Sequence, residues 1–315
     1  MYQQFFVMFA MIFTGYFLRK INFIKEEMNN SLNKFIVYCA YPLMLTYNIG
    51  TMDMNARLFK EFILMMIVSG VLFAGASAFV YFYAKIRKFP SRASNVAEMC
   101  MVCPNNGFMG FPMGLAFLGG EGLLMMMAQN SFMNIYFFTY NLYVLRRNNK
   151  ERNKFSIKAV TTATVKVLLN PNILAMFVGF FICLTSFSLD NGLGVYMNYI
   201  GGAATPMAMI FIGSTLAGSN FWEMLKNHIV WESSIIKLIV IPVTAAIIVN
   251  FLPLPTPIKV ITVLGLSFPT AATVPMLSEQ EGQNHELASK ILFFSTVVSM
   301  GTVPLTITLI KGLFM

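Results

Sequence analysis

Two short segments rich in proline, glycine and small polar residues carry the residue types that could do chemistry. The first reads PNNGFMGFPMG over residues 104–114, and the second reads GLSFPTAATVPMLSEQEG over residues 265–282. Proline removes a backbone donor and clashes with the carbonyl four residues earlier, so a helix passing through either segment is expected to break. The helix that restarts after a break exposes free N–H groups at a positive dipole end, which attracts a carboxylate or another anion. The sequence therefore predicts anion binding at two broken helices.

Amide, hydroxyl and glycine residues beside the predicted breaks are the expected contacts of such an anion. The predicted substrate-binding residues are Asn105, Asn106, Gly107, Gly110 and Pro112 in the first segment, Asn130 and Asn134 in a neighbouring apolar stretch, and Pro269, Thr270, Thr273 and Pro275 in the second segment. Asn130, Asn134 and Asn141 keep a spacing of i, i+4, i+11, which puts them on one face of an α-helix. A structural alternative stays open, because proline kinks and hydrogen bonds between helices are common in membrane proteins.

The chain that must position these segments has the composition of a membrane protein. Of its 315 residues, 57% are hydrophobic and only 11% are charged, and the mean hydropathy is +0.67. A soluble domain carries about 25% charged residues, and one soluble core could not bury so much apolar surface. The composition excludes a soluble enzyme, a disordered chain and a nucleic-acid-binding protein. The lipid bilayer is the expected surrounding, and the amino terminus is expected to be a first spanning helix, not a signal peptide.

Sequence motifs of enzymes and cofactor sites are absent. The sequence contains no HExxH, no G-x-S-x-G and no phosphate-binding loop, so neither metalloprotease, serine hydrolase nor ATP-driven chemistry is expected. Cys100 and Cys103 form a C-x-x-C, but they lie in an apolar stretch without a βαβ context. No enzyme activity, cofactor or metal site is therefore predicted.

Ten stretches free of Asp, Glu, Lys and Arg approach the roughly 20 residues that a helix needs to cross the hydrocarbon. They cover residues 1–18, 35–52, 62–84, 99–120, 122–145, 167–189, 191–221, 238–258, 260–278 and 291–310. The eighth span begins at 238 or near His228, which would bring Glu232 and Lys237 into its first turns. Both are expected at the membrane interface, loosely paired, with the Lys237 stem snorkelling. The predicted fold class is an all-α membrane protein with ten transmembrane helices.

The distribution of basic residues predicts the orientation. Loops after odd-numbered spans hold 17 of the 22 Lys and Arg residues, and the opposite loops hold four. Cytoplasmic loops carry the excess of Lys and Arg, so the odd loops are expected inside and both termini outside. The longest loop, residues 146–166, is basic and lies at the midpoint of the chain.

An internal repeat with an offset near 164 residues relates the two halves. Pro42 falls on Pro206, Ser131 falls on Ser295, and the two proline-broken spans, the fourth and the ninth, correspond. Five spans per half is an odd number, so the second half must be inverted in the membrane, which is an architecture of transporters. The predicted domains are a first five-helix repeat over 1–145, a linker over 146–166 and a second repeat over 167–315.

Short motifs occur in a characteristic order along nearly the whole chain. They are Gly15-Tyr16 with Arg19-Lys20, Pro42, Asn106-Gly107 with Gly110, Phe111 and Pro112, Asn170-Pro171, Pro206 with Gly213, Pro242, and Ser295-Thr296 with Thr302 and Pro304. Their order and spacing resemble the auxin efflux carrier family, the bacterial relatives of plant PIN-type carriers. The chain lacks the long central hydrophilic loop of the plant carriers, which agrees with the bacterial type.

The resemblance implies a five-plus-five inverted-repeat carrier whose fourth and ninth spans cross at their breaks beside the substrate. Spans 1, 2, 6 and 7 would form a scaffold, often with a dimer interface. Spans 3–5 and 8–10 would form a transport domain that moves in an elevator-like cycle. Family substrates are small organic anions, among them auxin and dicarboxylates such as malate or malonate. By match to the family motif, Asn106 and the Pro112 break would contact the substrate carboxylate, with residues 269–275 opposite.

The expected function is secondary transport of a small organic anion across the plasma membrane by a homodimer. Coupling to a proton, on Glu98, on Glu279 or on the substrate itself, or to a sodium ion stays open. Two alternatives also stay open: a channel or receptor-like module that binds an anion without a transport cycle, and a membrane scaffold that binds no ligand.

Overall fold

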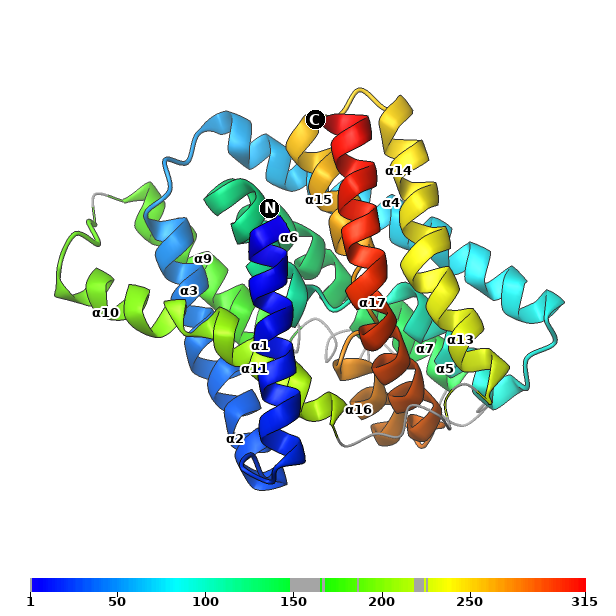
Figure 1. The fold of residues 1–315 in the computed structure, drawn as a ribbon. Helices are drawn as coiled ribbons and strands as arrows, with labels where there is room; N and C mark the ends of the chain where they lie inside the picture. The colour runs from blue at the N-terminus through cyan, green and yellow to red at the C-terminus, as the bar shows by residue number, and fades with distance from the viewer. Residues whose placement is uncertain (1, 148–164, 166–167, 186, 218–223, 225) are drawn as a thin grey trace. The chain divides into compact units, whose positions relative to one another are not determined.

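Regular structure in the described part of the chain is entirely helical. The computed structural model describes residues 2–147, 165, 168–185, 187–217, 224 and 226–315 (Figure 1). The single β-type contact in this part is an isolated bridge between Pro104 and Thr270. The predicted linker over 146–166 lies, apart from residues 146, 147 and 165, outside the described residues.

Five helical stretches are long and apolar enough to cross a membrane. They are Ala56–Ile86, Asn106–Arg146, Gly192–Leu216, His228–Phe251 and His285–Phe314, and shorter apolar helices cover Pro171–Leu184 and Thr256–Leu266. Helix is present within each of the ten expected ranges. The all-helical membrane class is confirmed, and ten crossings arranged as an inverted repeat stay a prediction.

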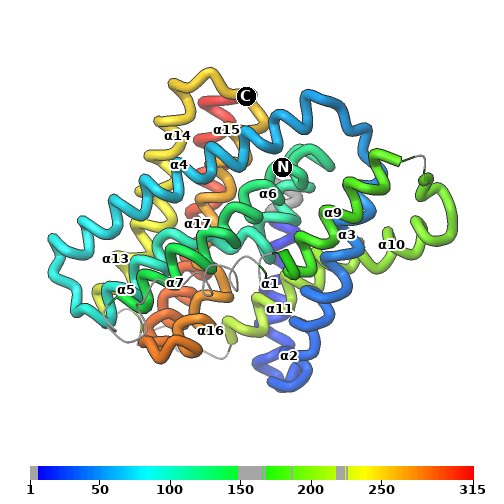
Figure 2. Tube along the Cα trace, turned by 180° about the vertical axis from the view of Figure 1, so that it is seen from behind, coloured from blue at the N-terminus to red at the C-terminus, as the bar shows by residue number. Residues whose placement is uncertain are grey.

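The chain folds into two compact units. Figures 1 and 2 are coloured by residue number, so the segments of each unit can be found from the colour bar. The first unit consists of Met1–Lys60, Pro112–Leu124 and Val165–Ser219. The second unit consists of Glu61–Phe111, Met125–Thr164 and Asn220–Met315.

The first unit is built around close helix contacts. Its helices are α1 (Tyr2–Lys20), α2 (Glu26–Phe35), α3 (Tyr41–Gly50), α9 (Pro171–Leu184), α10 (Gly192–Gly202) and α11 (Ala204–Leu216). Helix α1 packs along α11, and α3 packs on α9 and α10. A Cβ on Gly15 would lie 2.1 Å from the Ile210 carbonyl oxygen, and one on Gly213 would lie 1.8 Å from that of Ile12. Glycine on both helices therefore lets the α1 and α11 backbones touch.

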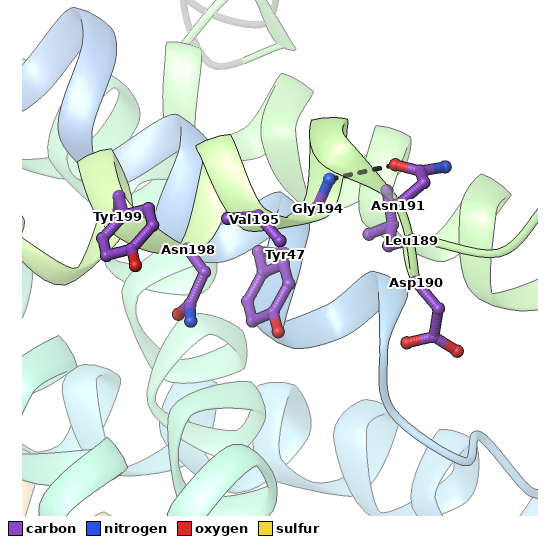
Figure 3. A pocket seen from close by; sticks show the side chains of 8 residues that line it. All are labelled: Tyr47, Leu189, Asp190, Asn191, Gly194, Val195, Asn198 and Tyr199. Atoms are coloured by element: carbon purple, nitrogen blue, oxygen red, sulfur yellow. Dashed lines mark hydrogen bonds between the residues drawn. The ribbon is translucent and has the colours of Figure 1, made fainter.

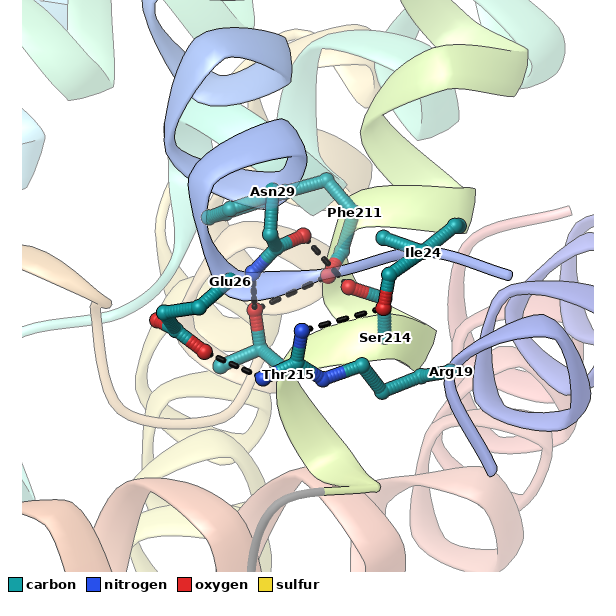
Figure 4. Close-up of polar contacts among 7 residues, drawn as sticks. All are labelled: Arg19, Ile24, Glu26, Asn29, Phe211, Ser214 and Thr215. Atoms are coloured by element: carbon teal, nitrogen blue, oxygen red, sulfur yellow. Dashed lines mark hydrogen bonds and ion pairs between the residues drawn. The ribbon is translucent and has the colours of Figure 1, made fainter. Parts of the chain in front are cut away.

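A buried polar cluster joins α2 to α11 in the same unit (Figure 4). Asn29 donates to the Thr215 hydroxyl at 3.3 Å and accepts a hydrogen bond from the Ser214 hydroxyl. At the turn before α2, Arg19 pairs with Glu26 and donates to the Ile24 carbonyl at 3.0 Å. Because Asn29 and Ser214 bond to each other, their polar groups can be buried without an unpaired donor.

The second unit contains the extended segments 103–105 and 267–272, which interrupt helices in the two proline-rich stretches. Its helices are most of α4 (Ala56–Ile86), α5 (Ser91–Val102), α6 (Phe111–Tyr136) from Met125 onward, α7 (Leu142–Arg146), α13 (His228–Ile235), α14 (Ile241–Phe251), α15 (Thr256–Leu266), α16 (Thr273–Gln280) and α17 (His285–Phe314). Helix α17 packs against α5, α13, α15 and α16. Helix α6 bends at Leu118 and Gly119, where Gly119 has φ +60°, near the end of the range predicted as the fourth span.

Wide π turns precede three of the prolines that fall in helical stretches. The turns η1 (Ile36–Ala40), η2 (Asn106–Gly110) and η4 (Ile236–Val240) each end two residues before a proline, namely Pro42, Pro112 and Pro242. A fourth, η3 (Phe137–Asn141), joins α6 to α7. A π turn bonds each N–H one residue further back than an α-helix does, which relieves the clash of the proline ring with the preceding turn. The helices therefore continue through these prolines.

Candidate functional site

The two broken helices of the second unit meet at their extended segments. Helix α5 ends at Val102 and α15 ends at Leu266, and residues 103–105 and 267–272, here called the crossing, connect them to η2 and α16. The Asn105 N–H donates to the Pro269 carbonyl at 2.8 Å, and the Ala271 N–H donates to the Cys103 carbonyl at 3.0 Å. Each break thus satisfies backbone groups that the other leaves free.

The break in the first segment lies at Pro104, upstream of the expected position at Pro112. Pro112 is the second residue of α6 and follows η2 without interruption of the helix. The reason is pairing: residues 103–105 find hydrogen-bond partners in the other broken helix, whereas the strain at Pro112 is absorbed by the π turn. In the second segment the break is centred on Pro269, and Pro275 lies in the first turn of α16.

Thr270 ties the crossing to its surroundings. Its hydroxyl donates to the Cys100 carbonyl at 2.9 Å, and its N–H donates to the Ser295 hydroxyl at 3.2 Å. Both Thr270 and Ser295 are fully buried. In this conformation the Thr270 hydroxyl proton is used in a hydrogen bond within the protein. Thr273, at the start of α16, is exposed.

The two asparagines after Pro104 have different surroundings. The Asn105 side chain accepts from the Phe108 N–H at 3.4 Å and so caps η2. Asn106 is fully buried and donates from Nδ2 to the Gln129 Oε1 at 3.3 Å, while its own Oδ1 has no partner. Gln129 in turn donates to the Thr262 carbonyl at 3.3 Å. Asn106 is therefore the predicted residue that retains an unused polar atom at the crossing.

Gly107 and Gly110, the two glycines predicted to contact the substrate, occupy one open and one packed position. A Cβ on Gly107 would meet no atom within 4 Å, so open space adjoins the residue after Asn106. A Cβ on Gly110 would lie 2.8 Å from the Met126 sulfur, so Gly110 serves helix packing.

The prediction that Lys237 lies at the membrane interface with a snorkelling side chain is wrong. It lies in η4, is fully buried, and donates to the carbonyls of Val102 at 3.3 Å and Leu266 at 3.4 Å. These are the last residues of α5 and α15, directly before the two breaks. The predicted loose pairing with Glu232 is also wrong, because Glu232 pairs with Arg87 and accepts from Tyr83 at 2.7 Å. The Lys237 side chain thus donates to the negative ends of both broken helices.

A π turn interrupts the α-helix along which the amide face of the fifth span is predicted. Asn130 is buried and Asn134 is half-buried on α6, and Asn141 follows in η3. A π turn accommodates one extra residue, which rotates the downstream helix and breaks the α-helical register. Asn141 contacts the crossing by another route, since its Nδ2 lies 2.9 Å from the Cys103 sulfur.

Two consecutive arginines at the end of α7 hold carboxylates from both broken helices. Arg147 donates to both Glu98 oxygens, at 2.8 and 3.2 Å, and Arg146 donates to both Glu281 oxygens, at 2.6 and 2.7 Å. Burial acts to lower the pKa of Arg147, but its hydrogen bond and charge attraction to Glu98 outweigh this and raise the pKa above its usual value. Of the two predicted proton carriers, Glu98 is thus ion-paired and Glu279 is exposed at the end of α16.

An open pocket of about 440 Å³ lies in the first unit (Figure 3). Tyr47 of α3 and residues of α10 and the turn before it line the pocket, and Asp190 supplies its carboxylate. None of the predicted substrate-binding residues is among its lining residues.

Comparison with known proteins assigns the family. Residues 1–307 match the family described as membrane transport protein. The chain belongs to this family. The resemblance to PIN-like auxin efflux carriers is confirmed, and the chain is a multi-pass membrane transporter, not an enzyme.

Relatives of the chain cover almost its whole length. An uncharacterized transporter of Methanothermobacter thermautotrophicus is 24% identical over 300 residues, covering 94% of each chain. An uncharacterized transporter of Methanocaldococcus jannaschii is 26% identical, covering 93% of this chain and 94% of its own. A Rhizobium meliloti protein named "Putative malonate transporter" is 28% identical, covering 96% of this chain and 94% of its own.

Three features of the two broken helices and their surroundings were missed or misassigned by sequence reasoning. Lys237 looked like an interfacial residue, Gln129 was one of several polar residues in its span, and Arg146 and Arg147 counted only as cytoplasmic charge. The isolated position of Lys237 inside an apolar stretch was the available signal, because a lysine in a membrane span faces the protein interior or a polar cavity.

Proposed function

We propose that the protein is a secondary transporter of small organic anions, with dicarboxylates such as malonate as the substrate class. Its substrate site is the crossing together with Asn106 and the open space at Gly107. The observation that carries this proposal is the placement of Lys237 against the last carbonyls of α5 and α15. The name of the Rhizobium meliloti relative agrees with the substrate class.

The charge balance at the crossing favours an anion. Helix C-termini carry partial negative charge and helix N-termini partial positive charge. Lys237 lies on the two negative ends, and the positive N-terminal ends that begin at Asn106 and Thr273 remain to attract an anion. No carboxylate pairs with Lys237 among the ion pairs of the described residues. A buried carboxylate of the substrate would balance this charge.

An inverted repeat of ten crossings, five in each half, is part of the proposal. The reciprocal backbone bonds at the crossing, with one N–H donated each way, support it because two inverted halves would meet in this manner. The repeats would cover 1–145 and 167–315. By the positive-inside distribution both termini lie outside the plasma membrane.

An elevator-type cycle is proposed from the division into two units. The first unit contains the predicted spans 1, 2, 6 and 7, and the second contains the rest except Pro112–Leu124. The first unit would be the scaffold and the dimer interface, and the second would carry the substrate. A proton or sodium ion would couple the cycle.

A binding screen tests the proposal. Purified wild-type protein is heated with malonate, malate, succinate, acetate and indole-3-acetate, and the unfolding temperature is measured. Ligands that bind only the folded state raise this temperature, and at one concentration a tighter ligand raises it further. At least one dicarboxylate is expected to raise it, and no response to any carboxylate would contradict the proposal. Exchange of labelled for unlabelled substrate in proteoliposomes separates a carrier from an anion-binding receptor or channel.

A further inference from the structure

A chain of three polar groups runs from α15 to the first broken helix. The Thr262 carbonyl accepts from Gln129 Nε2, and Gln129 Oε1 accepts from Asn106 Nδ2, each at 3.3 Å. Gln129 is fully buried, and a Cβ on Gly265 would lie 1.7 Å from its Oε1. The glycine at 265 thus makes the space in which the Gln129 amide lies.

The Thr262 carbonyl fixes the direction of both hydrogen bonds in this series. A backbone carbonyl can only accept, so the Gln129 atom facing Thr262 must be the amide nitrogen. The Gln129 atom facing Asn106 is then the oxygen, which also can only accept. Asn106 must therefore turn its nitrogen toward Gln129. Rotating either amide by half a turn would set two acceptors against each other.

Asn106 consequently presents its carbonyl oxygen away from Gln129. This oxygen is buried and has no partner, and the neighbouring residue Gly107 borders open space. A buried acceptor without a donor is unfavourable, so the site is built to receive a donor. A carboxylate cannot supply one, because an ionised carboxylate only accepts.

We propose that the substrate carries a hydrogen-bond donor, an O–H or N–H, which it gives to Asn106 Oδ1. This inference rests on the proposed function and narrows its substrate class. The ligand is an anion with one ionised carboxylate and one donor group: a dicarboxylate that keeps one proton, a hydroxy acid or an amide acid. The carboxylate lies toward the positive helix ends, and the donor lies on Asn106.

Two analogues of equal charge and similar size test the inference. Malonamate carries a carboxylate and an N–H donor, whereas monomethyl malonate carries a carboxylate and an ester without a donor. Both are monoanions at neutral pH. Their dissociation constants are measured by calorimetry on wild-type protein, with malonate and with the succinate pair, succinamate and monomethyl succinate, in parallel, in sodium-containing and sodium-free buffer.

The wild-type protein is expected to bind the amide acid at least about tenfold more tightly than the ester of the same length, because a site that accepts a substrate donor rejects the analogue lacking it. Asn106→Ala is expected to reduce the preference to about threefold or less, and Asn48→Ala to leave it unchanged, since Asn48 bonds the Met44 carbonyl of its own helix. Equal affinities of the wild type for the amide acid and the ester would overturn the inference and leave the proposed function intact. The same conclusion would follow if the affinities differed between the buffers with and without sodium but not between the two ligands. Binding of none of these carboxylates would overturn both.

Discussion

Lys237 is the residue on which the electrostatic account depends. A lysine is rarely buried completely, because an ammonium without partners in an apolar interior costs several kcal/mol (about 3–5 when one partner of a buried pair is removed). Here two helix-end carbonyls, at 3.3 and 3.4 Å, share the charge. Lys237 thus supplies hydrogen-bond donors to the last carbonyls of two broken helices.

Replacing Lys237 by Met is expected to weaken malonate binding by about tenfold or more, since hydrogen bonds and attractions that involve a charge contribute about 1.5–3 kcal/mol. Lys237→Arg keeps the charge and is expected to retain part of the affinity. The measurement is calorimetric titration with malonate, and Lys226→Met, at an exposed position, is the control. If Lys237→Met bound malonate with the wild-type dissociation constant, the charge of Lys237 would have no part in binding.

Gly107 offers a test that separates binding from folding. A Cβ at Gly107 or at Gly301 would meet no atom within 4 Å, so Gly107→Ala and Gly301→Ala should both fold with little change in unfolding temperature. Only Gly107→Ala is expected to weaken malonate binding, because its methyl group enters the space beside Asn106. If both variants bind malonate like the wild type, the space at Gly107 is not the substrate site.

At the scale of elements, the sequence predicts the helices and their prolines well and the places of the breaks only in part. Pro104, Pro112 and Pro269 look alike in sequence, yet the chain is extended at Pro104 and Pro269 and helical at Pro112. The difference arises from tertiary pairing between segments about 165 residues apart, with Asn105 bonded to Pro269. No local pattern encodes such a pairing, and the same holds for the π turn η3, which changes the helical register before Asn141.

The arginine pair at the end of α7 yields a prediction on stability. Arg147→Met would leave the buried Glu98 carboxylate without its partner, at a cost of about 3–5 kcal/mol in the free energy of unfolding. Adding Glu98→Gln should recover much of this loss, because a neutral amide is cheaper to bury. The readout is the unfolding temperature of the single and double variants.

Arg57→Met supplies the matched control for this experiment. Arg57 pairs with Glu121 at 3.0 Å, with 62% and 41% of the two side chains exposed, and an exposed pair contributes only about 0–1 kcal/mol. A loss in Arg57→Met as large as in Arg147→Met would contradict the distinction between the two ion pairs.

At the scale of the whole molecule, the two units are the candidates for fixed and moving parts. Close glycine contacts join α1 to α11 in the first unit, and the crossing joins the two broken helices of the second. The sequence suggested this division only through family resemblance, because which helices pack together depends on contacts between distant residues. Motion of one unit against the other is the consequence that can be measured.

Spin labels on introduced cysteines test that motion. Label pairs at Lys25 and Asp190 in the first unit, and at Lys88 and Gln280 in the second, are expected to keep their distances when malonate is added. A pair at Lys25 and Gln280, one label in each unit, is expected to change its distance distribution. Cys39 and Cys183, the partly buried native thiols, are replaced by Ser first. Changes within a unit as large as those between units would contradict an elevator.

Counterflow in proteoliposomes tests the central claim, carriage of a small organic anion through the crossing, most directly. Vesicles containing the protein and loaded with unlabelled malonate are placed in a trace of labelled malonate, and accumulation of label is followed over time. The wild type should accumulate label transiently, and Asn106→Ala and Lys237→Met should accumulate much less, at equal amounts of folded protein. Accumulation by both variants at the wild-type rate, or none by the wild type with any carboxylate of the binding screen, would contradict the account.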